Sequence, residues 1–124
     1  MTTVLLCLAG GLGAIARFVA DAFVNRRVRR SPMPLGTLSI NVSGSFLLGV
    51  LSGLVAHHAG LSPALAAVLG TGFCGGYTTF SAASLEAVRL WDADGPAQGI
   101  TYAATTLIGS VAAAGLGLWA SALA

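Results

Sequence analysis

Residues 72–81 read GFCGGYTTFS and lie inside an apolar run that begins near Leu61 and continues past Leu85. Three glycines and two threonines in such a run indicate a backbone that leaves helical geometry partway across a membrane. Unpaired backbone amides and carbonyls are costly in lipid, so a break persists only where protein or water satisfies them. Broken membrane helices often hold ions, because the released backbone groups become ligands. The stretch predicts an ion-conducting membrane protein with a broken helix at its centre.

The composition supports a membrane protein. Of the 124 residues, 56% are hydrophobic and 8% are charged, whereas about 25% of residues are charged in a typical soluble domain. A membrane-spanning helix needs about 20 apolar residues, and four such stretches fit, at residues 3–24, 35–56, 61–90 and 98–123. We therefore expect a single transmembrane domain over residues 1–124, all-α, with four transmembrane helices of which the third is broken mid-membrane.

The basic residues indicate how the chain is oriented. No lysine is present, and four of the six arginines fall between the first two predicted helices, while another ends the third helix on the same side. The six are Arg17, Arg26, Arg27, Arg29, Arg30 and Arg89. By the positive-inside rule, the first and third loops lie in the cytoplasm, and both termini and the His57-His58 loop lie outside. We expect a multi-pass protein of the cell membrane that contacts lipid, and no nucleic-acid partner.

The predicted break offers ligands of both signs. The last carbonyls before it lose their amide partners and can coordinate a cation, whereas the first amides after it favour an anion. Thr78, Thr79 and Ser81 add hydroxyl groups, and the ring of Phe80 presents a positive edge that can touch an anion weakly. A pore must release its ion, so weak contacts suit conduction. The alternative is a glycine kink that improves packing, with Phe80 facing lipid or the core.

Polar residues on the second and fourth predicted helices also have two interpretations. Asn41 either donates to an anion or joins helices through hydrogen bonds. Tyr102, Thr106 and Ser110 lie four residues apart, so they share one helix face. Their hydroxyl groups either line an anion path or bond to nearby helix carbonyls.

Charged residues near the helix ends remain open to several roles. Arg17 lies within a span, where an arginine is costly and suggests function. It either attracts anions toward a vestibule, pairs with Asp21 four residues away, or extends to the interface. Glu86 and Arg89 are expected to form a surface pair. No nucleophile and base are arranged for catalysis, so we expect no enzyme.

Three stretches of the chain resemble the signatures of the Fluc, or CrcB-type, fluoride channels. They are GGLGAIARF at residues 10–18, GTLSINVSGSF at residues 36–46, and GFCGGYTTFS at residues 72–81. The resemblance covers the whole chain. It implies an antiparallel, dual-topology-type dimer of four-helix subunits with two fluoride pores. It also implies passive export of fluoride, which reduces fluoride toxicity in the cytoplasm.

The same resemblance implies roles for individual residues. A central sodium ion (Na+) would be held by the backbone carbonyls of Gly75 and Thr78. Asn41 would be the pore asparagine, Phe80 the first ring of an aromatic box, and the stripe on the fourth helix a polar track. Together with neighbouring hydroxyl groups and a vestibule arginine, the expected fluoride pathway comprises Asn41, Thr79, Phe80, Ser81, Tyr102, Thr106, Ser110 and Arg17.

One departure from the family pattern bears on assembly. The family usually reads Phe-Ser-Thr-Phe at the break, whereas this chain has Ala82 and Ala83 in the last two positions. A path built from this subunit alone would lack the second ring, and a chain that inserts both ways should have balanced arginines. We therefore hypothesise a heterodimer with an oppositely oriented paralogue, with a homodimer left open. The alternatives are a non-conducting partner subunit and a small-molecule exporter of the four-helix, antiparallel-dimer kind.

Overall fold

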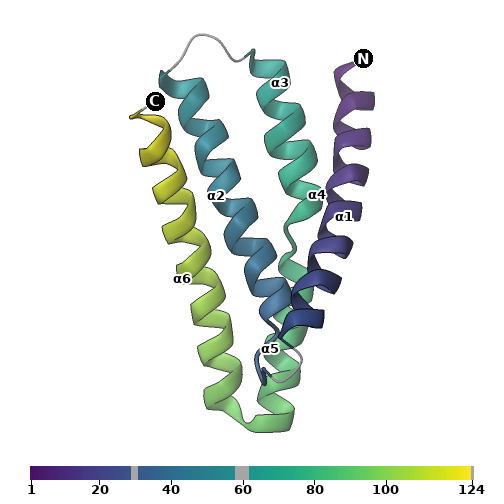
Figure 1. Cartoon of the computed structure of the whole chain (residues 1–124), viewed down its shortest axis with the longest axis vertical. Helices are drawn as coiled ribbons and strands as arrows, with labels where there is room; N and C mark the ends of the chain where they lie inside the picture. Colours follow the sequence, from purple (N-terminus) through teal and green to yellow (C-terminus); the bar gives the residue numbers. More distant parts are fainter. Residues whose placement is uncertain (29–30, 58–61, 124) are drawn as a thin grey trace.

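The computed structural model describes residues 1–28, 31–57 and 62–123, and these ranges contain helices and no strand (Figure 1). The elements in order are α1 (Thr2–Arg27), α2 (Leu35–His57), α3 (Pro63–Ala67), η1 (Val68–Cys74), α4 (Gly75–Tyr77), α5 (Phe80–Asp94) and α6 (Pro96–Ser121). Element η1 is a π-helix. The all-α class predicted from the sequence is confirmed.

Three of these helices, α1, α2 and α6, are long and apolar enough to cross a membrane. Many of their large apolar side chains are exposed, and only 6% of the most apolar stretch of α1 is buried inside the protein. Such a surface suits a hydrocarbon solvent rather than water. The remaining predicted span, residues 61–90, is not one helix but the succession from α3 to α5, and Leu61 falls outside the described residues. Figure 1 shows both chain termini at the same end of the bundle.

The connections are shorter than the sequence pattern predicted. The predicted spans leave residues 91–97 as the third loop, but α5 continues to Asp94 and only Gly95 separates it from α6. Gly95 has a φ of 97°, a conformation open to glycine, and Pro96 then occupies the first turn of α6. Helix α1 likewise continues through Arg27. The predicted orientation also used Arg29, Arg30 and His58, which lie outside the described residues.

Glycines bring α1 against the segment that precedes the break. A Cβ atom added at Gly13 would collide with the carbonyl oxygen of Phe73, and one at Gly76 would collide with that of Gly10. The two backbones are therefore in direct contact. Close approach through small residues is a main source of helix association in membranes. The hydrophobic effect does not bring helices together there, because the lipid tails are as apolar as the side chains.

A second pair of backbones, those of α2 and α6, approaches in the same way. A Cβ atom at Gly49 would collide with the carbonyl oxygen of Ala114, and one at Gly117 would collide with that of Phe46. These two helices make the most extensive contact in the described structure. Gly49 and Gly117 thus lie on the surfaces through which these two helices pack.

The segment from α3 to α5 changes partner along its length. Before the break, η1 and α4 pack mainly on α1, whereas α5 packs mainly on α6. The change requires a bend in direction between Tyr77 and Phe80, which Figure 1 shows as a stretch without helical coils. The break therefore joins the two packed pairs into one bundle.

The glycine contacts give a test with a matched control on the same helix. In Gly117→Ala the new methyl group must displace the backbone of α2, at a cost of about 1–3 kcal/mol. In Gly115→Ala the methyl group enters space with no atom within 4 Å. Thermal unfolding in detergent should show a lower midpoint for Gly117→Ala and an unchanged one for Gly115→Ala. Equal midpoints for the two variants would contradict the close packing of α2 and α6.

Candidate functional site

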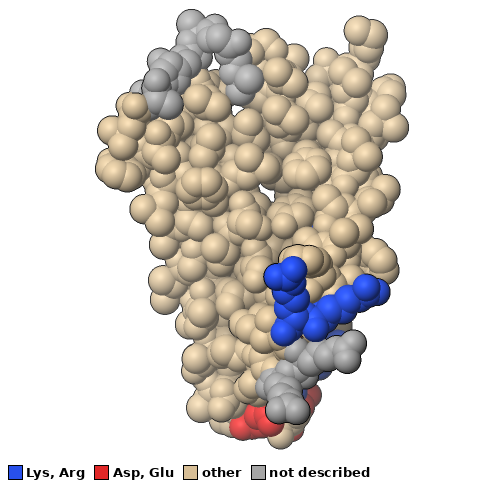
Figure 2. All heavy atoms as spheres, viewed as in Figure 1, with Lys and Arg blue, Asp and Glu red and all other residues tan. Residues whose placement is uncertain are grey.

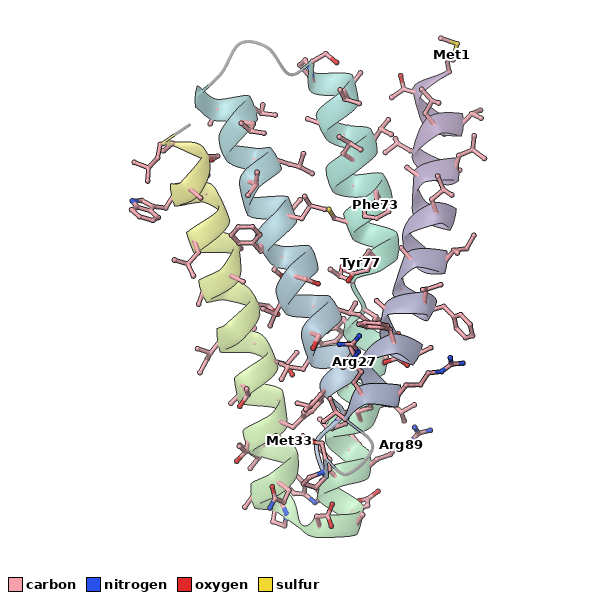
Figure 3. All side chains as sticks on the ribbon, in the orientation of Figure 1. Met1, Arg27, Met33, Phe73, Tyr77 and Arg89 are labelled. Carbon is pink, nitrogen blue, oxygen red and sulfur yellow. The ribbon has the colours of Figure 1, made fainter. Side chains whose placement is uncertain are left out.

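The backbone leaves helical geometry at the two threonines and not at the glycines. Thr78 has φ −78° and ψ 162°, and Thr79 has φ −151° and ψ 119°, both extended, while Gly75 keeps helical angles. A β-branched side chain favours the extended conformation. Just before this point the rings of Phe73 and Tyr77 stack, and their centroids are 5.9 Å apart. Both residues are labelled in Figure 3.

Asn41 of α2 forms hydrogen bonds with both backbone groups of Thr79, the amide and the carbonyl. Its Oδ1 accepts from the Thr79 amide at 2.8 Å, and its Nδ2 donates to the Thr79 carbonyl oxygen at 2.9 Å. Both residues are buried. A primary amide has two N–H donors, so Asn41 has a second N–H beyond the bond to Thr79. The interhelical interpretation of Asn41 therefore accounts for only part of its hydrogen-bonding capacity.

Two carbonyl oxygens at the break have lost the amide partners that a continuous helix would give them. In a continuous helix the Gly75 carbonyl would accept from the Thr79 amide, which instead donates to Asn41. The Thr78 carbonyl would accept from the Ala82 amide, which instead donates to Thr79 Oγ1 at 3.2 Å. Backbone carbonyls released in this way suit Na+. The described residues contain no cluster of three or more histidine, cysteine or acidic side chains that could hold a metal instead. The residues present thus fit the sodium site that the resemblance implied.

The hydroxyl groups at the break are bound locally. Thr79 Oγ1 caps α5 by accepting from the Ala82 amide and lies 3.3 Å from Ser81 Oγ. Thr78 Oγ1 donates to the Cys74 carbonyl oxygen at 2.9 Å. Ser81 is exposed and does not line the cavity described next.

A cavity of about 540 Å³ adjoins the break. Its wall comes from α2, η1, α4, α5 and α6, and is mostly apolar. Among the predicted site residues, those that line it are Asn41, Gly75, Thr78, Thr79, Phe80, Thr106 and Ser110. An apolar pocket with a few convergent polar groups is the usual form of a ligand site. The structure therefore brings together residues from three predicted helices that the sequence could only name separately.

Thr106 lines this cavity, and its hydroxyl oxygen is buried. Its side chain is 8% exposed, and its Oγ1 makes no hydrogen bond in the described structure. The Tyr102 hydroxyl, one turn away, lies near enough to interact with it but donates to Glu86. Buried hydroxyl groups are normally hydrogen-bonded, so an exception requires an explanation. The described residues supply no hydrogen-bond partner for the Thr106 hydroxyl.

Phe80 is largely outside the protein core. It is 88% exposed and lines the open side of the cavity, as does Ala83 one turn further along α5. An aromatic ring this exposed beside the predicted path is consistent with contact to an ion or to a second subunit. The methyl group of Ala83 leaves room where the family pattern has a ring.

Tyr102 does not line the cavity. It is completely buried, and its hydroxyl donates to Glu86 Oε2 at 2.8 Å, while Thr37 Oγ1 donates to Oε1 of the same carboxylate at 3.1 Å. The predicted surface pair of Glu86 and Arg89 was therefore wrong. Thr37 and Glu86 were missed as partners of the stripe, because residues 37, 86 and 102 are far apart in sequence and share no spacing.

Arg17 lies half-buried on α1 and away from the cavity lining. No ion pair joins it to Asp21 among the described residues, so that predicted pairing was wrong. The Asp21 carboxylate lies instead against Gly36, in the first turn of α2. An acidic group there is favoured by the positive end of the helix dipole.

These features define a small all-helical membrane protein in which a helix break adjoins a cavity with buried polar groups. The chain belongs to the family described as "CrcB-like protein, Camphor Resistance (CrcB)", whose profile matches residues 4–118. It is 50% identical over 118 residues to "Fluoride-specific ion channel FluC 2" of Cutibacterium acnes, covering 95% of each chain. It is 51% identical over 125 residues to "Fluoride-specific ion channel FluC 1" of Leifsonia xyli subsp. xyli, covering 96% of this chain and 85% of that one. "Fluoride-specific ion channel FluC 2" of Mycobacterium tuberculosis is 40% identical over 112 residues, covering 90% and 84%.

The pairing of Asn41 with Thr79 predicts a large loss of stability in Asn41→Leu. Leucine has a similar size but leaves the Thr79 amide and carbonyl buried without partners, at about 1–3 kcal/mol for each group. Ser52→Ala serves as a control on the same helix, because Ser52 is exposed and bonds only to Leu48 within α2. The thermal unfolding midpoint in detergent should fall markedly for Asn41→Leu alone. A midpoint like that of the unmodified chain would show that the break is held by other contacts.

Proposed function

We propose that the chain is a subunit of a fluoride-specific ion channel that lets fluoride leave the cell passively and so reduces its toxicity in the cytoplasm. The observation that carries the proposal is the mostly apolar cavity beside the break, which is lined by the neutral polar residues Asn41, Thr106 and Ser110. The names of the relatives, each a fluoride-specific ion channel, support the choice of ion. Those names do not favour the small-molecule exporter.

The proposed path uses neutral hydrogen-bond donors. Fluoride moves past the hydroxyl groups of Ser110 and Thr106 and the second N–H of Asn41, and these donors replace part of its water shell. The edge of the Phe80 ring adds a weak attraction for the anion. No arginine or lysine lines the described cavity, so the ion is held loosely enough to leave. Thr79 lines the cavity and caps α5, whereas Ser81 and Tyr102 lie around the path rather than in its lining. Arg17 is assigned to the vestibule.

The proposed membrane topology has four spans in the cell membrane. Helices α1, α2 and α6 supply three, and the succession from α3 to α5 supplies the fourth, broken at Thr78 and Thr79. An even number of crossings agrees with the two termini at one end (Figure 1). Trp91 and Trp119 are exposed near the ends of α5 and α6, where tryptophans favour the membrane interface. The end that bears the arginines faces the cytoplasm.

The proposed assembly is an antiparallel dimer. The cavity is open on the side of Phe80, and a Cβ atom at Gly75 would meet nothing within 4 Å. A second subunit that covers this side would enclose the path. The carbonyl oxygens of Gly75 and Thr78 would then hold Na+ near the dimer centre. When bound, the ion supplies positive charge that balances the released carbonyls of the break.

Ala83 favours a heterodimer over a homodimer. It lines the cavity at the place where a second ring is expected, so an oppositely oriented paralogue would have to supply that ring. The one-sided arginines point the same way, because they disfavour insertion in both directions. A subunit that assembles but does not itself complete a pore is the second candidate, and the same observation supports it.

Thr106→Val tests the ion path without disturbing the fold. Valine keeps the shape, and the lost hydroxyl has no hydrogen bond in the described chain to lose. We expect fluoride efflux from liposomes loaded with potassium fluoride to fall about tenfold or more, since hydrogen bonds to charged groups contribute about 1.5–3 kcal/mol. Thr105→Val, at an exposed position on the same helix, should leave efflux unchanged. Equal efflux in both variants would remove Thr106 from the path.

The heterodimer is tested by comparing fluoride efflux from three preparations: this chain alone, a paralogue whose arginines lie on the opposite loops, and the two co-expressed. We expect the co-expressed pair to exceed either chain alone by about tenfold, because only the pair supplies complete aromatic contacts in opposite orientations. Full efflux from this chain alone would overturn the obligate heterodimer but not the fluoride channel. No efflux from any of the three would overturn both.

A further inference from the structure

The cytoplasmic end of α1 carries positive charge that the protein does not neutralise. Arg26 and Arg27 lie in the last turn of α1 and are exposed. Figure 2 shows arginine side chains gathered at this end of the molecule. No ion pair joins an arginine to an acidic residue in the described part of the chain. The Glu86 carboxylate accepts hydrogen bonds from Thr37 and Tyr102 instead.

The Arg27 side chain is held in a defined position. Its guanidinium carbon lies 4.4 Å from the centre of the Phe23 ring, one turn back along α1. A cation over an aromatic face uses the flat side of the guanidinium. The N–H groups at the edge therefore remain available, and no described residue accepts from them. That edge matches two oxygens of a phosphate group.

An apolar stripe leads along α1 to this guanidinium. Ile15, Val19 and Phe23 precede Arg27 in steps of four residues and are 62%, 60% and 55% exposed. The stripe lies away from the face of α1 that packs on η1 and α4 through Gly13. Ile15 and Phe23 are about 12 Å apart at 1.5 Å per residue, close to half of the roughly 30 Å hydrocarbon core. The stripe thus has the length of one bilayer leaflet.

We propose that this face of α1 binds an anionic phospholipid of the cytoplasmic leaflet. The phosphate of the lipid pairs with Arg27 and Arg26, and an acyl chain lies along Ile15, Val19 and Phe23. Charge complementarity favours an anionic lipid, because the amine of a zwitterionic headgroup would meet the same arginines. It also disfavours a parallel second copy of the chain, which would bring arginine against arginine. Basic clusters next to a membrane-spanning helix are a common signal for such lipids.

The test is native mass spectrometry of the assembled, full-length protein with phosphatidylglycerol or phosphatidylcholine added. Phosphatidylglycerol should be retained in preference. Its affinity should fall about fivefold in Arg27→Gln, and further in Arg26→Gln/Arg27→Gln, since a basic residue near an anionic surface contributes about this factor. Phe23→Leu, which keeps the stripe apolar but removes the ring, should weaken binding less.

Arg89→Gln is the matched control, because it removes one exposed positive charge from α5 instead of α1. It should leave phosphatidylglycerol affinity unchanged. An equal loss in this variant would reduce the effect to net charge and overturn the site. Displacement of the lipid by millimolar inorganic phosphate would assign the arginines to free phosphate instead. Retention of neither lipid would mean that a second subunit covers the stripe, and the proposal would fail.

Discussion

The structure depends on how the peptide group of Thr79 is satisfied. In a membrane, an amide and a carbonyl that leave a helix have no water to bond. Asn41 supplies both an acceptor and a donor from one side chain at 2.8 and 2.9 Å, so the chain can remain extended at Thr78 and Thr79. The same pairing deprives the Gly75 carbonyl of its usual amide. One interhelical contact therefore both permits the break and frees one of the two carbonyls that we assign to the proposed sodium site; the cap of α5 by Thr79 frees the other, that of Thr78.

The break also explains why the cavity exists. Because η1 and α4 follow α1 while α5 follows α6, the segment crosses the bundle and cannot fill the space beside α2 and α6. Direct backbone contact at glycines fixes both helix pairs, so the surrounding helices cannot close the gap. Asn41 and Thr106, which line the cavity, then lie beside the crossing point.

The sequence predicted features that arise from local composition. The apolar runs, the break within residues 72–81 and the shared face of Thr106 and Ser110 follow from hydrophobicity and periodicity.

The sequence did not predict features that arise from three-dimensional packing. The pairing of Glu86 with Thr37 and Tyr102 joins three helices with no common spacing. The glycines drew attention to the break, yet Gly76 serves close packing against Gly10, and the extended residues are the β-branched threonines. The turn before α6 was misjudged because Trp91 to Asp94 pack as helix in spite of polar residues that are typical of turns.

The distribution of charge separates two kinds of anion contact. Within the described cavity every polar side chain is neutral, whereas Arg26 and Arg27 are exposed in the last turn of α1. A charged donor inside a path for a small anion would bind too tightly for release, and a neutral donor at the interface would not compete with water for phosphate. The Glu86 carboxylate is kept from the cavity lining by two hydroxyl donors, which removes a repulsive charge from the same region. Neutral donors inside and arginines outside thus let one short chain treat a permeant ion and a lipid headgroup differently.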